Sequence, residues 1–271
     1  MSTHVSYGGG VMMTPAGPGG RIPASVLLVS PHLDDAVMSA GATIAALAAG
    51  GSQVVVCTVF AGKPQPPFSD VAADFHSRCG LGPDPVGVRR QEDFAALTVL
   101  GAKAIHLDFL DAIYRRSSAG WLCRHPLAMF GRGLPPETTL TADIIREVGL
   151  LIQNLNPAQV WTCAAIGQHV DHRITRQAVT AAAIGHPLLL WEDLPYGLGR
   201  PPPHPSVIGS PPGTGAGHLQ VKLDAIGCYE SQVRMEWPGT DWQQLVTGQA
   251  TARHHALGAY ELLWPPGSGT A

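Results

Sequence analysis

Positive charge is scarce and scattered in this sequence. Lysine and arginine number 17 against 20 aspartates and glutamates, so the formal net charge is −3, and only three of the 17 are lysines. A protein that binds the phosphate backbone of a nucleic acid needs Lys and Arg gathered on one surface. Since the sequence has no basic run, a nucleic-acid partner is not expected.

Paired cysteines are missing as well. The chain has five cysteines, an odd number, and none stands in a Cys-x-x-Cys pair. This spacing argues against a disulfide framework and against a cysteine-based zinc cluster. We expect most of them to be small buried apolar side chains: Cys57, Cys79, Cys123, Cys163 and Cys228.

The sequence also lacks a secretory signal and a long apolar run. Its first 22 residues are rich in glycine and contain no basic segment followed by an apolar one. The least polar stretch, residues 36–51, is interrupted by Ser39 and Thr43 and is too short to span a bilayer. We expect a flexible tail over residues 1–22, no membrane contact and a cytoplasmic location.

What the sequence does have is an alternation of short apolar runs with helical patterns. Hydrophobic residues make up 45% of it, which excludes a disordered chain. Strands are expected over residues 26–29, 54–60, 104–107, 159–163 and 188–191. Helices are expected over 36–49, 89–100, 144–155, 171–184 and 219–233. This alternation predicts an α/β, Rossmann-like fold, with a mostly parallel sheet covered by helices on both faces.

We expect one catalytic domain over residues 23–271, with long loops at about 61–88, 108–139 and 199–217. Loops of this length inside a compact domain are usually functional or disordered. Trp121 and Phe130 in the second one favour an ordered binding loop, and their broad apolar faces suit a bulky substrate.

The most informative segment is Ser30-Pro31-His32-Leu33-Asp34-Asp35, at the junction of the first strand and the first helix. Ligands of parallel sheets bind outside the carboxyl ends of the strands. His32 and Asp35 are three residues apart and can converge on one metal ion, which leaves Asp34 for proton transfer. The alternative is that the two aspartates merely cap the helix.

A second segment of the same kind is His169-Val170-Asp171-His172, which follows the strand at 159–163 and opens a helix. His172 completes a His, Asp, His set that leaves one position open for water, as a catalytic zinc ion requires. Asp171 is placed to orient a neighbouring imidazole.

Together these segments resemble the PIG-L/LmbE family of zinc-dependent N-deacetylases, whose marks are [PA]-H-P-D-D and a later H-x-D-H. Two further segments agree: Arg89-x-x-Glu92 with Leu100-Gly101, and Lys222 with Tyr229-x-Ser231-Gln232. The similarity runs from about residue 26 to 233. Leu33 stands in place of the usual proline, and Gly167 stands where thiol-cofactor members often have tyrosine. The form PHLDDAV is closer to the deacetylases that modify sugar-bearing antibiotics.

The resemblance implies one zinc ion per chain, held by His32, Asp35 and His172. It implies that Asp34 is the general base and that His169 stabilises the oxyanion and protonates the departing amine. A cationic His169 would suit the second role.

Five further residues are candidates for contacts with the substrate. A carboxylate at Asp111 is placed to accept hydrogen bonds from sugar hydroxyls, although it also suits a loop cap. Lys222 and Tyr229 either line the rim of the site or pack within a helix face. The full set is Asp111, Arg89, Trp121, Lys222 and Tyr229.

The function that this resemblance implies is removal of an N-acetyl group from an N-acetylglucosaminyl unit. The expected substrate is a small natural product, an aminoglycoside or glycopeptide antibiotic precursor, and the reaction releases acetate and a free amino sugar. The alternative enzyme is a mycothiol-pathway deacetylase or conjugate amidase. An alternative of another class is a sugar-binding module without metal.

Overall fold

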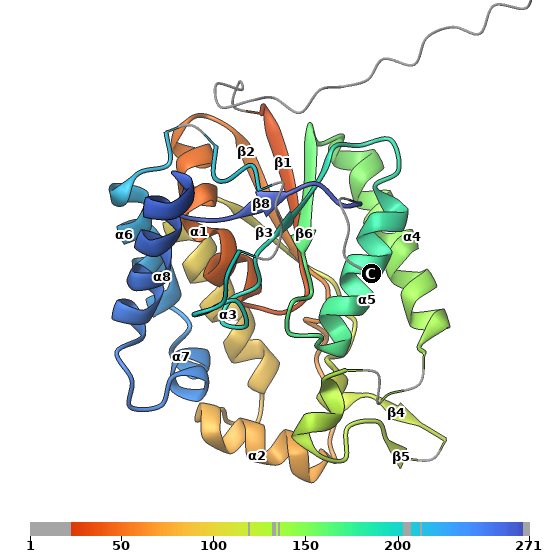
Figure 1. Ribbon diagram of the computed structural model, residues 1–271. Coiled ribbons are helices and arrows are strands. Elements are labelled where there is room, and N and C mark those ends of the chain that lie inside the picture. Colours follow the sequence, from red (N-terminus) through yellow and green to blue (C-terminus); the bar gives the residue numbers. More distant parts are fainter. Residues whose placement is uncertain are drawn as a thin grey trace, which may run out of the picture.

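A six-stranded sheet forms the centre of the protein, here described from a computed structural model (Figure 1). The structure describes residues 23–118, 120–131, 134, 136–202, 207–211 and 213–267, so the tail expected over 1–22 lies outside them. The strand order is β3 (Lys103–His106), β2 (Gln53–Thr58), β1 (Ser25–Ser30), β6 (Gln159–Cys163), β7 (Leu188–Trp191) and β8 (Leu263–Trp264). All pairings are parallel except that of β7 with β8.

Helices cover both faces of this sheet, as predicted (Figure 1). One face carries α1 (Asp35–Ala49), α3 (Pro85–Val99), α6 (Ala216–Gly227) and α8 (Trp242–Leu257), and the other carries α4 (Thr138–Leu155) and α5 (Val170–Ala182). Side chains of β1 alternate between the two cores: Val26 and Leu28 belong to the first, Leu27 and Val29 to the second. In the described residues no helix is long and apolar enough to cross a membrane.

The strand order reverses at β1, and this reversal positions the site. From β1 the chain proceeds through β2 to β3 on one side of the sheet, and it later returns to β6 on the other side of β1. The connections that leave the carboxyl ends of β1 and β6 therefore run to opposite faces, and a crevice opens between them.

Two of the three long loops carry structure of their own. The connection at 61–88 contains α2 (Asp70–Cys79), whose first turn is capped by Ser69, since the Ser69 side chain accepts a hydrogen bond from the Ala72 amide. The connection at 108–139 contains η1 (Ala112–Tyr114), β4 (Arg116–Ser117), β5 (Gly120–Trp121) and η2 (Pro126–Met129). The connection expected as a long loop over 61–88 is therefore only partly loop, because it contains α2 and the first turn of α3.

The C-terminal part also differs from expectation. The single helix predicted over 219–233 is two helices, because the backbone of Tyr229 leaves the helical conformation between α6 and α7 (Glu230–Glu236). Helix α8 and strand β8 were not predicted at all. Only Val246, Ala250 and Arg253 of α8 are buried, so the apolar periodicity that signals a helix is weak there.

Helix α1 is kinked inside the core, and a buried ion pair stabilises the kink. Ala40 has non-helical dihedral angles (φ −127°, ψ 16°). The carboxylate of Glu261 accepts hydrogen bonds from the amides of Ala42 (3.0 Å) and Thr43 (2.8 Å), which the kink has freed. The Lys222 ammonium lies 2.6 Å from the same carboxylate and balances its charge.

We predict that Glu261→Gln lowers the free energy of unfolding by about 3–5 kcal/mol, because it leaves the Lys222 ammonium buried without an opposite charge. Urea denaturation measures the change. The control is Arg146→Gln, which breaks an exposed ion pair with Asp143 and should leave the midpoint where it is. A Glu261→Gln midpoint equal to that of the control would contradict the role given to this pair.

Candidate active site

The turn between β1 and α1 fixes two side chains of the predicted site. The His32 amide donates a hydrogen bond to Asp35 Oδ2 (2.9 Å), and the Ala36 amide donates to Ser30 Oγ (3.1 Å). These bonds close the turn at the carboxyl end of β1 and direct the Asp35 carboxylate back towards His32. His32 and Asp35 are both buried.

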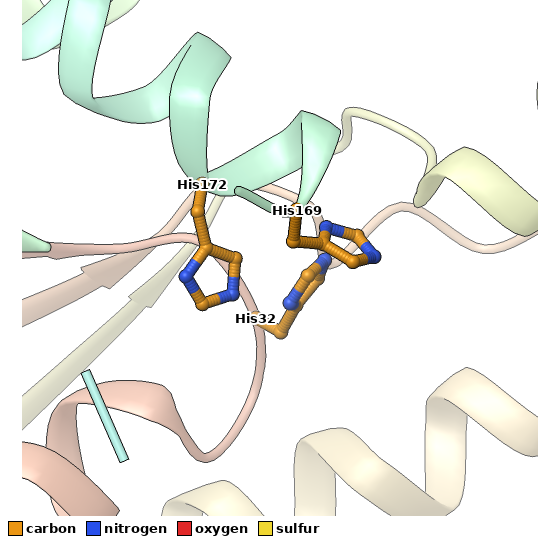
Figure 2. Close-up of side chains that lie close together, drawn as sticks. All are labelled: His32, His169 and His172. Carbon is orange, nitrogen blue, oxygen red and sulfur yellow. The ribbon is translucent and has the colours of Figure 1, made fainter. Parts of the chain in front are cut away.

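The start of α5 supplies two further imidazoles. Figure 2 shows that His169 and His172, at the first turn of this helix, point towards the same space as His32 from the β1–α1 turn. The ring centroids are 5.0 Å apart for His32 and His169, 5.3 Å for His32 and His172, and 5.4 Å for His169 and His172. One nitrogen from each of the three rings lies within 4.8 Å of the others.

The Asp35 carboxylate lies between two of these rings. Its Oδ2 atom is 3.2 Å from His32 Nδ1 and 3.2 Å from His172 Nε2. Burial alone would raise the pKa of Asp35, but the charges and hydrogen bonds of His172 and His32 hold it well below its usual range. Burial lowers the pKa of His32, and the nearby carboxylates, led by Asp111, outweigh it and raise that pKa to about 10.

These donors fit a zinc ion. His172 Nδ1 lies 2.9 Å from Asp193 Oδ1, so Nδ1 carries the hydrogen and Nε2 is left to accept. That Nε2 atom is buried and, among the described residues, has no polar partner other than Asp35 Oδ2, 3.2 Å away. Two imidazole nitrogens and a carboxylate oxygen are a set that zinc takes with one position open. Without a metal ion, protons on His32 and His172 supply the positive charge that balances the nearby carboxylates. A bound cation would supply this charge instead, and its binding would release the protons.

Two side chains that hold this arrangement in place were not singled out from the sequence. Asp193 contacts His172 and also accepts a hydrogen bond from the Ile166 amide (3.1 Å). It follows β7 at the same edge of the sheet, so the rule that found Asp35 also points to it. Arg115 lies 2.7 Å from Asp171 and binds Glu137 with two hydrogen bonds. Its position in a long loop gave no such signal.

The imidazole that Asp171 contacts is that of His32, from the β1–α1 turn, and not that of a histidine next to it in the sequence. Asp171 Oδ2 is 3.1 Å from His32 Nε2 and accepts a hydrogen bond from the Ala112 amide (2.9 Å). The carboxylate is fully buried, and its pKa is held far below the usual range: burial would raise it, but the Arg115 charge and the His32 hydrogen bond prevail. The adjacent His169 is fixed differently, through a hydrogen bond from the Asp171 amide to its Nδ1 atom (3.2 Å).

This geometry corrects the expectation of a cationic His169. Burial and the positive charge of His32 lower the pKa of His169 to about 3, so its imidazole is neutral. Since Nδ1 accepts a hydrogen bond, the hydrogen of the neutral ring is on Nε2. His169 is therefore a hydrogen-bond donor through Nε2 and carries no charge.

Asp34 lies beside the histidines and is paired with Arg89. Arg89 Nη2 is 3.4 Å from Asp34 Oδ2, and both side chains are largely buried. Burial and the negative charge of Asp35 raise the pKa of Asp34 to about 8, although Arg89 opposes the shift. Arg89, expected to contact the substrate, thus contacts the Asp34 carboxylate.

The remaining candidates are divided between the site and the core. Asp111 Oδ2 lies 3.7 Å from His32 Nε2, while Oδ1 caps η1 by accepting a hydrogen bond from the Ile113 amide (3.1 Å). The loop cap is therefore present, and a contact of Asp111 with sugar hydroxyls stays a prediction. Trp121 packs under the Arg116 guanidinium (4.4 Å) and lines a groove of about 280 Å³ beside the start of α2.

Lys222 and Tyr229 do not face the crevice, and their assignment to the substrate is wrong. Lys222 is 1% exposed and pairs with Glu261. Tyr229 is fully buried, and its hydroxyl donates a hydrogen bond to Asp93 (2.7 Å). Both side chains instead hold helices α1, α3 and α6 together. This agrees with the alternative that they pack within the protein.

The family whose model matches this chain is PIG-L: GlcNAc-PI de-N-acetylase, over residues 27–183. The 2'-N-acetylparomamine deacetylase of Niallia circulans is 30% identical over 186 residues, which are 63% of this chain and 66%, just under two thirds, of that protein. The 1D-myo-inositol 2-acetamido-2-deoxy-alpha-D-glucopyranoside deacetylase of Corynebacterium glutamicum is 28% identical over 211 residues, 75% and 67% of the two chains.

Solved structures are similar over more of the chain. The zinc inhibited form of teicoplanin deacetylase is 35% identical, with a TM-score of 0.77 over 89% of this chain and 97% of that one. The N,N'-diacetylchitobiose deacetylase of Pyrococcus horikoshii, 16% identical with a TM-score of 0.57, shows the fold alone. These matches confirm the α/β fold and the resemblance to the antibiotic-tailoring deacetylases, which are hydrolases of amide bonds.

We predict that Asp193→Asn weakens zinc binding about 10- to 100-fold, because His172 loses the carboxylate that fixes its orientation. Competition with a chromogenic chelator measures the affinity. The control is Asp224→Asn on the exposed side of α6, which should bind zinc as the unaltered protein does. Equal affinities for the two variants would show that Asp193 does not support the metal ligand.

Proposed function

Since the chain belongs to the PIG-L family of GlcNAc-PI de-N-acetylases, we propose that it removes the N-acetyl group from an N-acetylglucosaminyl unit of a small natural product. The substrate class is an aminoglycoside or glycopeptide antibiotic precursor. The observation that carries the proposal is the convergence of His32, Asp35 and His172 beside the Asp34 carboxylate. The similarity to paromamine and teicoplanin deacetylases supports the substrate class.

In this proposal His32, Asp35 and His172 hold one zinc ion per chain. Zinc, when bound, polarises the acetamide carbonyl and lowers the pKa of the attacking water. The chain's own residues supply orientation: Asp171 fixes the His32 ring and Asp193 fixes the His172 ring. Arg115, paired with Asp171, keeps that carboxylate ionised in its buried position.

Asp34 and His169 carry the proton and the hydrogen bond of the reaction. Asp34 takes one proton from the attacking water as the new C–O bond forms. The resemblance implies that His169 protonates the departing amine; in this proposal Asp34 instead returns its proton to the nitrogen as the C–N bond breaks, because a neutral His169 has no proton to spare. The His169 Nε2–H donates a hydrogen bond to the carbonyl oxygen, where negative charge develops in a buried environment. Acetic acid and a free amine result, and the acid loses its proton to solvent to give acetate.

A second candidate is favoured by one match. The Corynebacterium relative is named for an acetamido sugar linked to myo-inositol. Hydrolysis of that acetamide would use the same zinc-holding residues together with Asp34 and His169. Comparing acetate release from the two kinds of glycoside separates the candidates. The single domain over 23–271 and the cytoplasmic location stay predictions.

We predict different losses for the two adjacent aspartates. Asp34→Asn should retain zinc and lose about 100- to 10,000-fold in kcat, because the amide keeps the shape but cannot accept a proton. Asp35→Asn should lose zinc, measured by atomic emission of the purified protein. Exchanged phenotypes would reverse the two assignments, and full activity of a metal-free sample would end the mechanism.

We also predict that free N-acetylglucosamine is a poor substrate, since binding of a remote group helps to align the acetamide. Leu127, in η2, is 77% exposed and lies three residues before Phe130, which packs against His169. We therefore expect it to contact a bulky apolar group of the substrate. Leu127→Ser should lower kcat/KM for a large apolar glycoside more than for free N-acetylglucosamine.

The matched control for this variant is Ile184→Ser, in the turn that follows α5, where the residue is 83% exposed. It should change neither substrate's kinetics. Equal losses on both substrates for Leu127→Ser would show that η2 supports the site and does not select the substrate.

A further inference from the structure

Two aromatic side chains border the histidines of the site. Phe130 meets His169 edge-on at 5.3 Å between centroids, and Tyr196 meets His172 edge-on at 5.5 Å. Phe130 and Tyr196 are 6.1 Å apart, and the two histidines 5.4 Å apart. The four rings thus form a closed set in which each is packed against the next, with imidazoles on one side and carbocyclic rings on the other.

The main chain fixes Phe130 in this position. Phe130 pairs with His169 through an antiparallel bridge, and the Gly131 amide donates a hydrogen bond to the Gln168 carbonyl (3.0 Å). The Phe130 side chain is nevertheless 37% exposed. A large apolar ring that is held rigidly yet left open beside a site is available to a ligand.

Tyr196 is fixed by a close approach to Gly167. A Cβ atom built on Gly167 would lie 2.4 Å from the Tyr196 ring, so this ring position requires glycine. The turn that carries Tyr196 is tied down on both sides: the Gly197 amide donates to the Asp193 carbonyl (2.8 Å), and Gln249 of α8 donates to the Gly197 carbonyl (3.1 Å). This turn follows the residues that match the family, 27–183.

We infer that Tyr196 and Phe130 form the surface against which the apolar face of the acetamido sugar packs. The inference rests on the proposed function and adds the specificity-determining residues to it. Phe130 and Tyr196 lie 5.3 and 5.5 Å from the imidazoles of His169 and His172. A sugar whose acetamide lies at these histidines therefore has its pyranose ring beside the two aromatic rings. The C–H face of a pyranose is apolar, and a rigid aromatic ring binds such a face at little entropic cost.

Binding is tested without turnover in a protein that carries Asp34→Asn and retains zinc. Its Kd for an alkyl N-acetylglucosaminide is measured by titration calorimetry. Adding Tyr196→Ala or Phe130→Ala should weaken binding about five- to tenfold, whereas Tyr196→Phe, which keeps the ring, should stay within twofold. Zinc content, measured on every variant, should not change.

Gly167→Ala tests the same surface without substituting either aromatic residue. Its added methyl group displaces Tyr196, so it should weaken binding in the same direction. Combined with Tyr196→Ala, it should cause no further loss, because the collision is gone. The control is Phe94→Ala on the outer side of α3, where the ring is 52% exposed, and it should bind normally.

Three outcomes would overturn the inference: unchanged binding by Tyr196→Ala, equal losses for Tyr196→Phe and Tyr196→Ala, or fully additive losses for Gly167→Ala and Tyr196→Ala. Acetate release by the unaltered enzyme is assayed in parallel. If the unaltered enzyme releases acetate but Tyr196→Ala leaves the Kd unchanged, only the aromatic surface is rejected and the proposed reaction stands. Weakened binding without any acetate release would reject the proposed reaction and leave the aromatic surface in place.

Discussion

The buried carboxylate of Asp35, held between His32 and His172, is the interaction on which the site depends. A buried charge is stable only when it is paired and hydrogen-bonded. The His32 amide and the two imidazoles satisfy this requirement, and through His172 they link the β1–α1 turn to the first turn of α5. The same negative charge that demands these partners makes the position suitable for a cation.

Around this group, each site side chain has a partner that fixes its orientation. Asp193 contacts His172, Asp171 contacts His32, and the Asp171 amide contacts His169. Asp193 follows β7 and Asp171 belongs to α5, so displacement of either segment would misplace a reacting group. Rigid placement of this kind suits hydrolysis, where small errors in alignment cost much of the rate.

Much of the fold could be predicted because the core strands are short apolar runs that alternate with amphipathic helices. β1, β2, β3, β6 and β7 all lie within two residues of their expected bounds. Helix α8 was missed because few of its side chains are buried, so its sequence carries little apolar periodicity. Helix α2 was missed because it has only ten residues, and its buried side chains, Ala72, His76 and Cys79, include a polar one and are too few to signal a helix. The split between α6 and α7 was missed because Tyr229 leaves the helix to reach a buried partner, Asp93, far away in sequence.

The sequence by itself determined the parallel sheet and the placement of His32, Asp34, Asp35, His169 and His172 at one edge of it, because strand polarity puts all carboxyl ends together. Only the tertiary structure decided the charge of His169, the burial of Lys222 and Tyr229, and the presence of Asp193, Arg115 and Tyr196 at the site. Burial and long-range pairing set these properties. Residues far apart in the sequence create that environment jointly, and no local pattern records it.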